Sequence, residues 1–269
     1  MRCSNRKNPS AQEVLGRMNR DPEYLASARE RIFRLHHGKL TDEQVAYHAV
    51  RSNSALLTVT HFRVGVSLFL CELLKARHVL DFAAGWGDRF TGFLAASTVE
   101  SITLVDPRPG SISGCKQQHE LVKHVLSKKK TVKYVQKPAE EALPTLSPSY
   151  DLIVTSPPYF NTERYGDDAK ETKGQIRHKV SSVEGYLKEF LYPVLDECSR
   201  LLSPGGWLAL NVDDNPDTLI CGPMVDYVRR HPRLEVVCTF GLCKGSGFGL
   251  GSEKRSESKA EPVYIIRRR

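Results

Sequence analysis

Short apolar runs alternate with amphipathic segments through most of the chain. The runs are five to seven residues long and rich in β-branched side chains, and they lie at 78–82, 101–106, 131–136, 151–156, 207–212, 234–240 and 263–267. Helical segments lie between most of them, at 88–96, 111–126, 184–202 and 217–231. This alternation predicts an α/β fold, a seven-stranded and mostly parallel sheet with helices on both faces. No helical segment separates the last two runs, so we expect them to form an antiparallel pair at one edge.

The first part of the chain has a different pattern. Residues 1–54 are charged and helical in character, with Ser10 as a cap, Pro22 just inside a helix start and Gly38 just past a helix end. We expect a small N-terminal helical extension over 1–54 and one larger domain over 55–269. A long apolar helix from Thr58 should lead into the first strand, and the glycine- and serine-rich stretch 243–261 should be a loop.

Composition limits the function classes. The 269 residues are 40% hydrophobic and 26% charged, which is ordinary for a globular protein. Seven scattered cysteines favour reduced thiols over a disulfide framework, and neither they nor the histidines have metal-ligand spacing. No apolar stretch is long enough for a membrane span or a leader. We therefore expect an intracellular protein, cytoplasmic or nuclear, without a metal or a membrane partner.

The net charge indicates the kind of partner that the protein could bind. The formal net charge is +8, and the isoelectric point is near 9.1. Such an excess favours association with a polyanion such as nucleic acid.

A glycine-rich turn, "DFAAGWGD" at 81–88, follows the first predicted strand. Gly85 and Gly87 tolerate positive φ and let the backbone approach a ligand closely. The spacing differs from G-x-G-x-x-G, which disfavours nicotinamide binding. Trp86, between the two glycines, either packs over a ligand or anchors the turn to the core.

An acidic residue, Asp106, ends the second predicted strand about twenty residues after the glycines. A carboxylate at this place can accept hydrogen bonds from ribose hydroxyls, so the two features together predict an adenosine-containing ligand. The alternative is that the segment is only a tight turn, in which Asp106, followed by Pro107, caps the next helix.

The stretch "YDLIVTSPPYF" at 150–160 is a buried strand that stops abruptly. Pro157 and Pro158 cannot donate backbone hydrogen bonds, so the strand should end at Ser156. The carboxyl ends of parallel strands are where ligands bind in open α/β sheets. A stiff corner carrying a hydroxyl and a ring therefore predicts one wall of an active site.

Together, "DFAAGWGD", "LVDP" and "SPPY" resemble the S-adenosylmethionine-dependent amino-methyltransferases, which carry a D/N/S-P-P-Y/F/W signature and methylate exocyclic amines of DNA or RNA bases. The resemblance covers about residues 55–269. Proteins of phages and large viruses with an AGWGDR and SPPYF pattern look most similar, and Glu261 and Pro262 follow in similar order. The resemblance implies a Rossmann-like fold, S-adenosyl-L-methionine as cofactor and a nucleic-acid partner, with room for a partner subunit.

The resemblance also implies roles for particular residues. The implied catalytic residues are Ser156, Pro157, Pro158 and Tyr159. The implied cofactor-binding residues are His61, Phe62, Arg63, Asp81, Ala83, Ala84, Gly85, Gly87, Asp88, Asp106, Pro107, Glu140 and Ser156. The implied substrate-binding residues are Tyr159, Phe160, Glu163, Tyr165 and Asp213.

The chemistry of an amine fits the corner. The lone pair of a base amine is delocalised into the ring, so acceptors that bind both amine hydrogens favour the pyramidal, nucleophilic form. The Ser156 hydroxyl and the Pro157 carbonyl can be those acceptors, and Tyr159 can stack on an extruded base. Serine at the first motif position favours cytosine N4 over adenine N6 in this class.

Two other functions remain open. One is amino methylation of a protein glutamine or a small molecule, although such loops usually begin with asparagine. The other is an inactive, methyltransferase-like subunit that binds nucleic acid. Retention of both the glycine turn and the whole SPPY corner argues against the second.

Overall fold

The computed structural model describes residues 20–23, 26, 30, 62–160, 176, 179–214, 218–243 and 260–269. Contacts divide the chain into two units, Met1–Thr60 and His61–Arg269. In the first unit the described residues are helical except for Asp21. The domain boundary predicted after residue 54 lies somewhat before this division. All that follows concerns the second unit.

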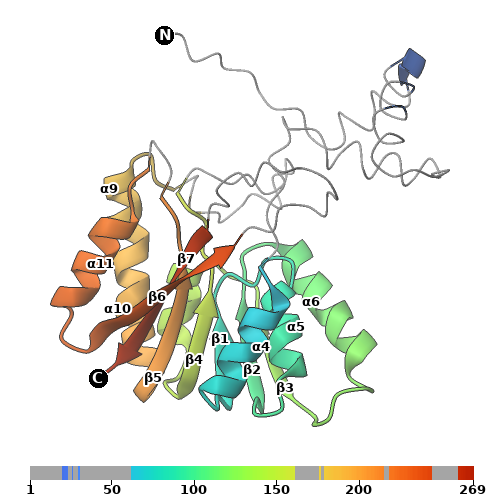
Figure 1. Ribbon diagram of the computed structural model, residues 1–269, viewed down its shortest axis with the longest axis horizontal. Helices are drawn as coiled ribbons and strands as arrows, with labels where there is room; N and C mark the ends of the chain where they lie inside the picture. The colour runs from blue at the N-terminus through green and yellow to red at the C-terminus, as the bar shows by residue number, and fades with distance from the viewer. Residues whose placement is uncertain are drawn as a thin grey trace, which may run out of the picture. The chain divides into compact units, whose positions relative to one another are not determined.

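A seven-stranded sheet forms the centre of the second unit (Figure 1). Its strands follow the order β3-β2-β1-β4-β5-β7-β6. They are β1 His78–Asp81, β2 Ser101–Val105, β3 Thr131–Val135, β4 Tyr150–Thr155, β5 Leu202–Asn211, β6 Leu234–Cys243 and β7 Ala260–Arg268. The first five are parallel, and β7 runs antiparallel to both β5 and β6. The predicted fold class, including the antiparallel pair at one edge, is confirmed.

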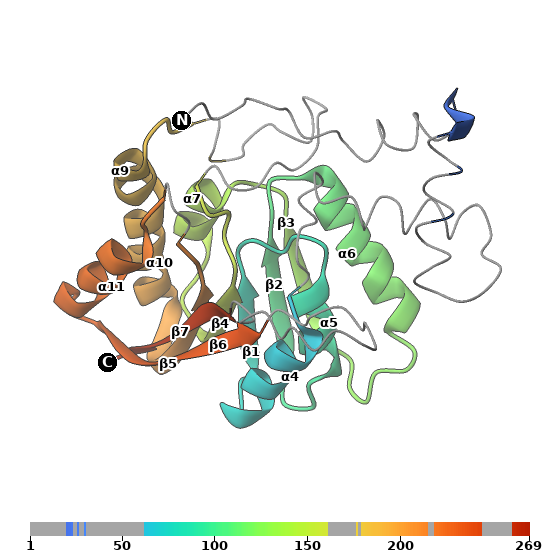
Figure 2. The same ribbon diagram turned by 45° about the horizontal axis from the view of Figure 1, so that its top comes forward.

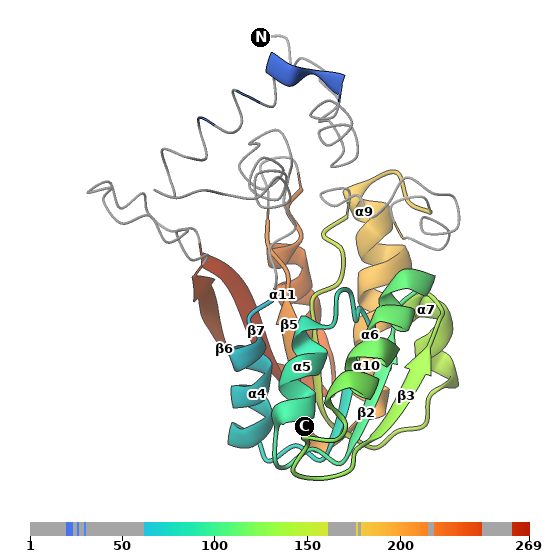
Figure 3. The ribbon, with the colours of Figure 1, turned by 90° about the vertical axis from the view of Figure 1, so that its right-hand side faces the viewer.

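Helices cover both faces of this sheet. They are α4 Val64–Leu73, α5 Asp88–Ala95, α6 Pro109–Val122, α7 Ala139–Ala142 with η1 Leu143–Thr145, α9 Val183–Tyr186 with η3 Leu187–Leu191, α10 Tyr192–Leu201 and α11 Cys221–Arg230. One core joins the sheet to α4, α5 and α6, and a second joins it to α7, α10 and α11. In the view from the β3 edge, α4 and α5 lie on one side of β2 and β3, and α7 lies on the other (Figure 3).

Alternate side chains of each strand enter the two cores. On β4, Leu152 and Val154 belong to the core under α4 and α5, and Ile153 belongs to the other. All three are fully buried. A strand covered on both faces needs apolar residues at every position, which is why these strands have continuous apolar sequences.

Strand β5 begins earlier than the sequence predicts. The sequence places its start at Trp207, whereas the strand begins at Leu202. The register between β4 and β5 shifts from Tyr150↔Leu202 to Leu152↔Trp207, so the "SPGG" stretch forms an irregularity within the strand. A side chain on Gly206 would meet the carbonyl oxygens of β4, which is why this irregularity requires glycine.

Helix boundaries also differ from the predicted ones. The helix predicted from Thr58 begins at Val64, and Phe62 and Arg63 precede it in non-helical conformation. The helix predicted over 184–202 contains a π-helical turn, Leu187–Leu191, which ends two residues before Pro193. A wider turn accommodates a proline because it tolerates the lost backbone donor.

Strand β1 is the topological switch point of the sheet, because β2 and β3 are added on one side of it and β4 and β5 on the other. It pairs with β2 on one side and with β4 on the other. The carboxyl ends of β1, β2 and β4 therefore lie together at one end of the parallel strands. This end comes forward with α7 in the view of Figure 2. This is the position at which open α/β sheets bind ligands.

The cysteines with described side chains are free thiols. Burial raises the pKa of Cys71, Cys115 and Cys221 to about 12, so these thiols are unreactive. No helix within the described ranges has the length and apolar character needed to cross a bilayer.

Candidate active site

The glycine turn between β1 and α5 depends on two residues with left-handed backbone. Gly85 has φ of 56° and Gly87 has φ of 86°. The Gly87 N–H donates to the Ala84 carbonyl at 3.1 Å, which closes the turn. A side chain on Gly87 would overlap Oε1 of Gln118, whose amide nitrogen donates to the Gly87 carbonyl. Helix α6 therefore supports the turn from one side.

A buried ion pair supports the turn from below. Arg89 Nε donates to Asp81 Oδ2 at 2.7 Å, and the exposed fractions of the two side chains are 8% and 0%. The second carboxylate oxygen accepts the Ala83 N–H at 3.1 Å, and the guanidinium also donates to the Ala83 carbonyl. Asp81 thus fixes the conformation of the turn.

Asp106 connects the glycine turn to the loop after β2. One carboxylate oxygen accepts the Gly85 N–H and the other accepts the Arg108 N–H, both at 2.9 Å. The N-cap residue of α6 is Arg108, and no side chain caps this helix. Asp106 therefore does not have the capping role that was the alternative. Burial raises the pKa of Asp106, although both backbone donors and the Arg108 charge oppose this effect.

The SPPYF corner at the end of β4 is held by rings. The Pro158 carbonyl accepts the Phe160 N–H at 3.0 Å and the Tyr186 hydroxyl at 2.8 Å. Phe160 has φ of 55°, and its ring lies 6.0 Å from that of Tyr186. The Ser156 and Tyr159 hydroxyls are hydrogen-bonded at 3.3 Å. Within the described residues, no hydrogen bond reaches the carbonyl of Pro157.

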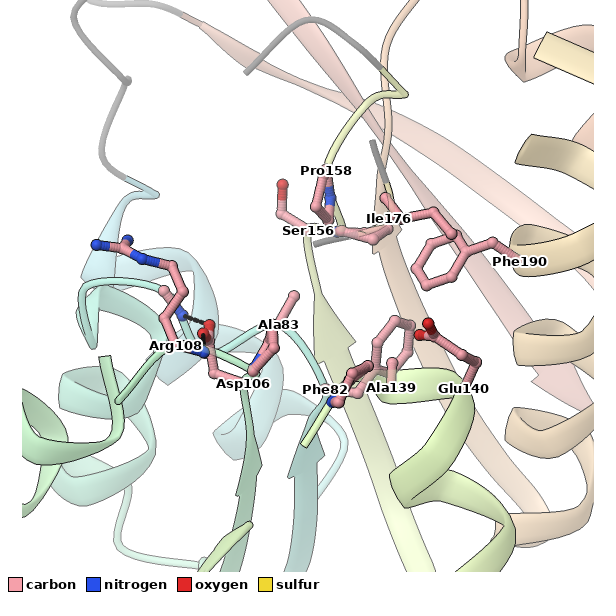
Figure 4. Close-up of a pocket in the computed structure, with 14 residues that line it drawn as sticks. Phe82, Ala83, Asp106, Arg108, Ala139, Glu140, Ser156, Pro158, Ile176 and Phe190 are labelled. Atoms are coloured by element: carbon pink, nitrogen blue, oxygen red, sulfur yellow. Dashed lines mark hydrogen bonds between the residues drawn. The ribbon is translucent and has the colours of Figure 1, made fainter. Parts of the chain in front are cut away.

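The turn and the corner line one cavity (Figure 4). Asp106 and Arg108 lie on one side of it, Phe190 and Glu140 lie on the other, and Ser156 and Pro158 lie above. The lining residues are Phe82, Ala83, Gly85, Asp106, Pro107, Arg108, Pro138, Ala139, Glu140, Ser156, Pro157, Pro158, Ile176 and Phe190.

The lining fits an adenosine-containing ligand. A side chain on Gly85 would meet only the Ala83 carbonyl within 4 Å, so the space above this glycine is open to the cavity. Carboxylates stand at two separate places, Asp106 and Glu140, where they can accept from ribose hydroxyls and from an adenine amine. The surface between them, including Phe82 and Phe190, is apolar enough to contact a base. Lys179 Nζ holds the Glu140 carboxylate at 2.6 Å.

The cavity brings together many of the residues predicted from the sequence. They are Ala83, Gly85, Asp106, Pro107, Glu140, Ser156, Pro157 and Pro158. They come from the loops after four strands, and the parallel sheet places these loops at one edge.

Several predicted residues are near the cavity without lining it. Asp81 lies beneath the turn. The Ala84 N–H donates to the Val105 carbonyl, and the Phe62 ring lies 5.2 Å from the Arg89 guanidinium carbon. Gly87 is the N-cap of α5, and Asp88 is the first residue of that helix. Arg63 is the N-cap of α4.

The predicted substrate residues have mixed positions. Tyr159 and Phe160 are both 8% exposed and pack in the core under the corner, so in this conformation neither presents its ring to a base. Asp213 follows β5, is half-buried and accepts the Asp214 N–H. His61, Glu163 and Tyr165 lie outside the described residues.

Six lining residues were not predicted: Phe82, Arg108, Pro138, Ala139, Ile176 and Phe190. Phe82 and Arg108 adjoin the predicted motifs, and Pro138 and Ala139 precede Glu140. These four could be found by predicting every residue of those loops to line the site. Ile176 and Phe190 reach the cavity only through tertiary packing. No group of three or more potential metal ligands occurs in the part of the chain that the structure describes.

Comparisons with known proteins agree with this geometry. Residues 150–247 match the family model described as DNA methylase. No curated protein sequence matches the chain significantly. Among solved structures, TrmN from Thermus thermophilus is 16% identical with a TM-score of 0.52, over 78% of this chain and 50% of that one. This chain therefore spans half the length of that protein.

Two further similar structures are methyltransferases by name. NodS, an N-methyltransferase from Bradyrhizobium japonicum, is 13% identical with a TM-score of 0.48, over 76% of this chain and 93% of that one. An rRNA methylase from Streptococcus thermophilus is 8% identical with a TM-score of 0.49, over 79% and 99%. At these identities the likeness concerns the fold.

The DNA methylase match begins with β4 and includes the SPPYF corner and β5. The fold and the cavity supply the other half of the site, at the ends of β1 and β2. The family match thus concerns the half of the site at the end of β4, and the likeness to solved structures concerns the fold.

Proposed function

We propose that this protein methylates the exocyclic amine of a nucleobase in DNA or RNA, with S-adenosylmethionine as methyl donor. The observation that carries the proposal is the single cavity lined by Gly85 and Asp106 on one side and by Ser156 and Pro157 on the other. When bound, S-adenosylmethionine would supply an electrophilic methyl group. Gly85, Asp106 and Glu140 would hold its adenosine part.

The amine-binding role falls to Ser156 and Pro157. The Pro158 carbonyl already accepts two hydrogen bonds, whereas the Pro157 carbonyl accepts none within the described residues. The Ser156 hydroxyl keeps a lone pair in addition to its contact with Tyr159. These two oxygens can accept both amine hydrogens, so that the nitrogen lone pair points away from them and toward the methyl donor.

Alignment should contribute more to the rate than the strength of these bonds. Each hydrogen bond contributes on the order of 1 kcal/mol net. Positioning two reactants can lower a barrier by about 7 to 11 kcal/mol. A corner stiffened by two prolines and by the Tyr186 hydroxyl suits this task, because it has little freedom to lose.

The burial of Tyr159 argues against the stacking role predicted for it from the sequence. Its ring packs under the corner and its hydroxyl contacts Ser156. We propose that Tyr159 is a positioning residue that orients the Ser156 hydroxyl. Stacking on the base would require the ring to leave the core.

The preferred base in this proposal is cytosine. Serine, a neutral acceptor, occupies the first position of the motif, and in the class that this sequence resembles serine accompanies cytosine N4 methylation more often than adenine N6 methylation. The DNA methylase match and the net charge of +8 support a nucleic-acid substrate.

The test is incubation of the protein with radiolabelled S-adenosylmethionine and separate pools of DNA, RNA and unfolded protein, followed by nucleoside analysis. We expect label in N4-methylcytidine or its deoxy form. Ser156→Ala should lower the rate about two- to twelvefold, as expected for one hydrogen bond. Ser113→Ala, an exposed serine on α6, is the matched control and should not change the rate.

Other outcomes select other functions. Label in N6-methyladenine would keep the reaction and change the base, and label confined to protein would contradict the nucleic-acid substrate. Absence of any heat in titration with S-adenosylmethionine would favour the inactive binding subunit.

A further inference from the structure

Trp86 is a large aromatic side chain exposed on a rigid turn. Its exposed fraction is 58%. The turn around it is fixed by hydrogen bonds from Gly85 to Asp106 and from Gly87 to Ala84. The backbone position from which this ring projects is therefore fixed before any ligand binds.

The guanidinium of Arg108 lies over the Trp86 ring, with its central carbon 5.0 Å from the ring centroid. Arg108 also lines the cavity, whereas Trp86 does not. The pair thus links the lining of the cavity to an exposed ring beside it. In Figure 4 the Arg108 side chain lies on the same side of the cavity as Asp106, and Ser156 lies above the cavity.

Neither reading of Trp86 from the sequence agrees with this position. A residue that covers a ligand in the cavity would line it, and a residue that anchors the turn would be buried. An exposed indole with a cation on one face is instead a common arrangement for binding nucleotides, because every base can stack on an aromatic ring and arginine pairs with phosphate.

We propose that Trp86 and Arg108 form a nucleotide-binding platform for a single-stranded segment of the substrate. Trp86 stacks on a base adjacent to the target, and Arg108 binds the phosphate between them. A base stacked on Trp86 has left its own neighbours, so the platform fits a single strand or an unpaired loop better than an intact duplex. The inference rests on the proposed function, since it names the form of the substrate.

Fluorescence anisotropy with short labelled single strands of DNA and RNA, in the presence of S-adenosylhomocysteine, tests the platform. Trp86→Ala should weaken binding roughly 5- to 150-fold, the range for one stacked base. Trp86→Tyr should restore most of the affinity. Arg108→Gln should reduce the slope of log affinity against log salt concentration by about one.

Phe69→Ala is the matched control. Phe69 is also an exposed aromatic residue, 60% exposed on α4. Its removal should leave strand binding unchanged. Thermal unfolding of each variant, followed by circular dichroism, checks that the fold is retained.

Intrinsic fluorescence gives a second readout. The chain contains two tryptophans, and the other, Trp207, is partly buried in β5 under Arg267. Stacking of a base should quench the emission of Trp86, and Trp86→Tyr should abolish this quenching while the Trp207 emission remains.

The outcomes separate this inference from the proposed function. No binding of any strand by the unaltered protein, together with no methyl transfer to nucleic acid, would contradict the proposed function. Normal binding and methylation with equal affinity for Trp86→Ala would overturn only the platform. A loss of S-adenosylhomocysteine affinity in Trp86→Ala would also overturn it and assign Trp86 to the cofactor. Duplexes binding as tightly as single strands would overturn the single-strand claim.

Discussion

The glycine turn and the proline corner lie at the same edge of the sheet, yet opposite means give them their shapes. The turn depends on backbone freedom, with left-handed Gly85 and Gly87 fixed by carboxylates, a guanidinium and an amide. The corner depends on restriction, with Pro157 and Pro158 held by ring packing and a hydroxyl.

The difference corresponds to what each side must present. The turn gives the cavity bare backbone beside a buried acid, which suits a ligand that is bound closely along its length. The corner gives the cavity two acceptor oxygens in fixed positions, which suits a reacting group. We therefore expect changes in the turn to reduce cofactor binding, and changes in the corner to reduce turnover while cofactor binding persists.

The largest effect is expected from Arg89→Leu. This change leaves the Asp81 carboxylate buried without its partner, so it should lower the free energy of unfolding by about 3 to 5 kcal/mol. Urea denaturation measures it. Arg77→Leu is the control, because its ion pair with Glu100 is exposed to solvent and should contribute little to stability. Equal effects of the two changes would contradict the supporting role of the buried pair.

Gly87→Ala should be nearly as damaging. The new side chain would adopt unfavourable positive φ, at a cost of about 1 to 3 kcal/mol, and would displace the amide end of Gln118. Thermal unfolding and titration with S-adenosylhomocysteine should both show the loss. Gly114→Ala, on α6 with open space around it, should instead be neutral or stabilise by up to about 1 kcal/mol. An unchanged cofactor affinity for Gly87→Ala would mean that the turn does not shape the cofactor site.

Asp106→Asn should weaken cofactor binding by about 1.5 to 3 kcal/mol, because a charged acceptor is lost. The raised pKa of Asp106 gives the sign of the pH dependence. Binding needs the ionised carboxylate, so affinity should fall on acidification beginning above the ordinary aspartate range near pH 4, and the variant should lack this dependence.

The control for Asp106 is Asp151→Asn. Asp151 also accepts two backbone N–H groups, from Arg77 and His78, at the opposite end of β1. Its loss should affect stability and leave cofactor affinity unchanged. Calorimetric titration across pH distinguishes the two variants.

The smallest effect is expected from Tyr186→Phe. Removal of the hydroxyl that binds the Pro158 carbonyl should cost about 0.5 to 1.5 kcal/mol in stability and lower methyl transfer, while cofactor affinity stays constant. Tyr150→Phe loses a comparable bond to Thr103 away from the corner and should keep full turnover. If both variants transfer methyl groups equally well, the stiffness of the corner is not important for the reaction.

Much of this fold could be predicted from local sequence, because central strands such as β4 are covered on both faces and so form continuous apolar runs. Gly85, Asp106 and Ser156 could be predicted for a related reason, since they follow these strands directly. The irregularity in β5 could not, because "SPGG" has the composition of a loop and only pairing with β4 makes it part of a strand.

Other parts of the site depend on packing that one sequence does not reveal. Phe190 lies in a π-helical turn far along the chain, and only the tertiary fold brings it to the cavity. The burial of Tyr159 was missed because "PPY" gives no indication of which way the ring turns. The likeness to phage and large-virus proteins stays a prediction.

The position of β7 also has a consequence for how the molecule assembles. Strand β6 has β7 as its single neighbour in the sheet, and β7 separates it from β5. During synthesis β6 therefore leaves the ribosome before the strand that will hold it, and the edge of β5 stays open for the same interval. Insertion of β7 between them completes the sheet, so this late pairing is the stage at which a nascent chain is most exposed to aggregation and to chaperones.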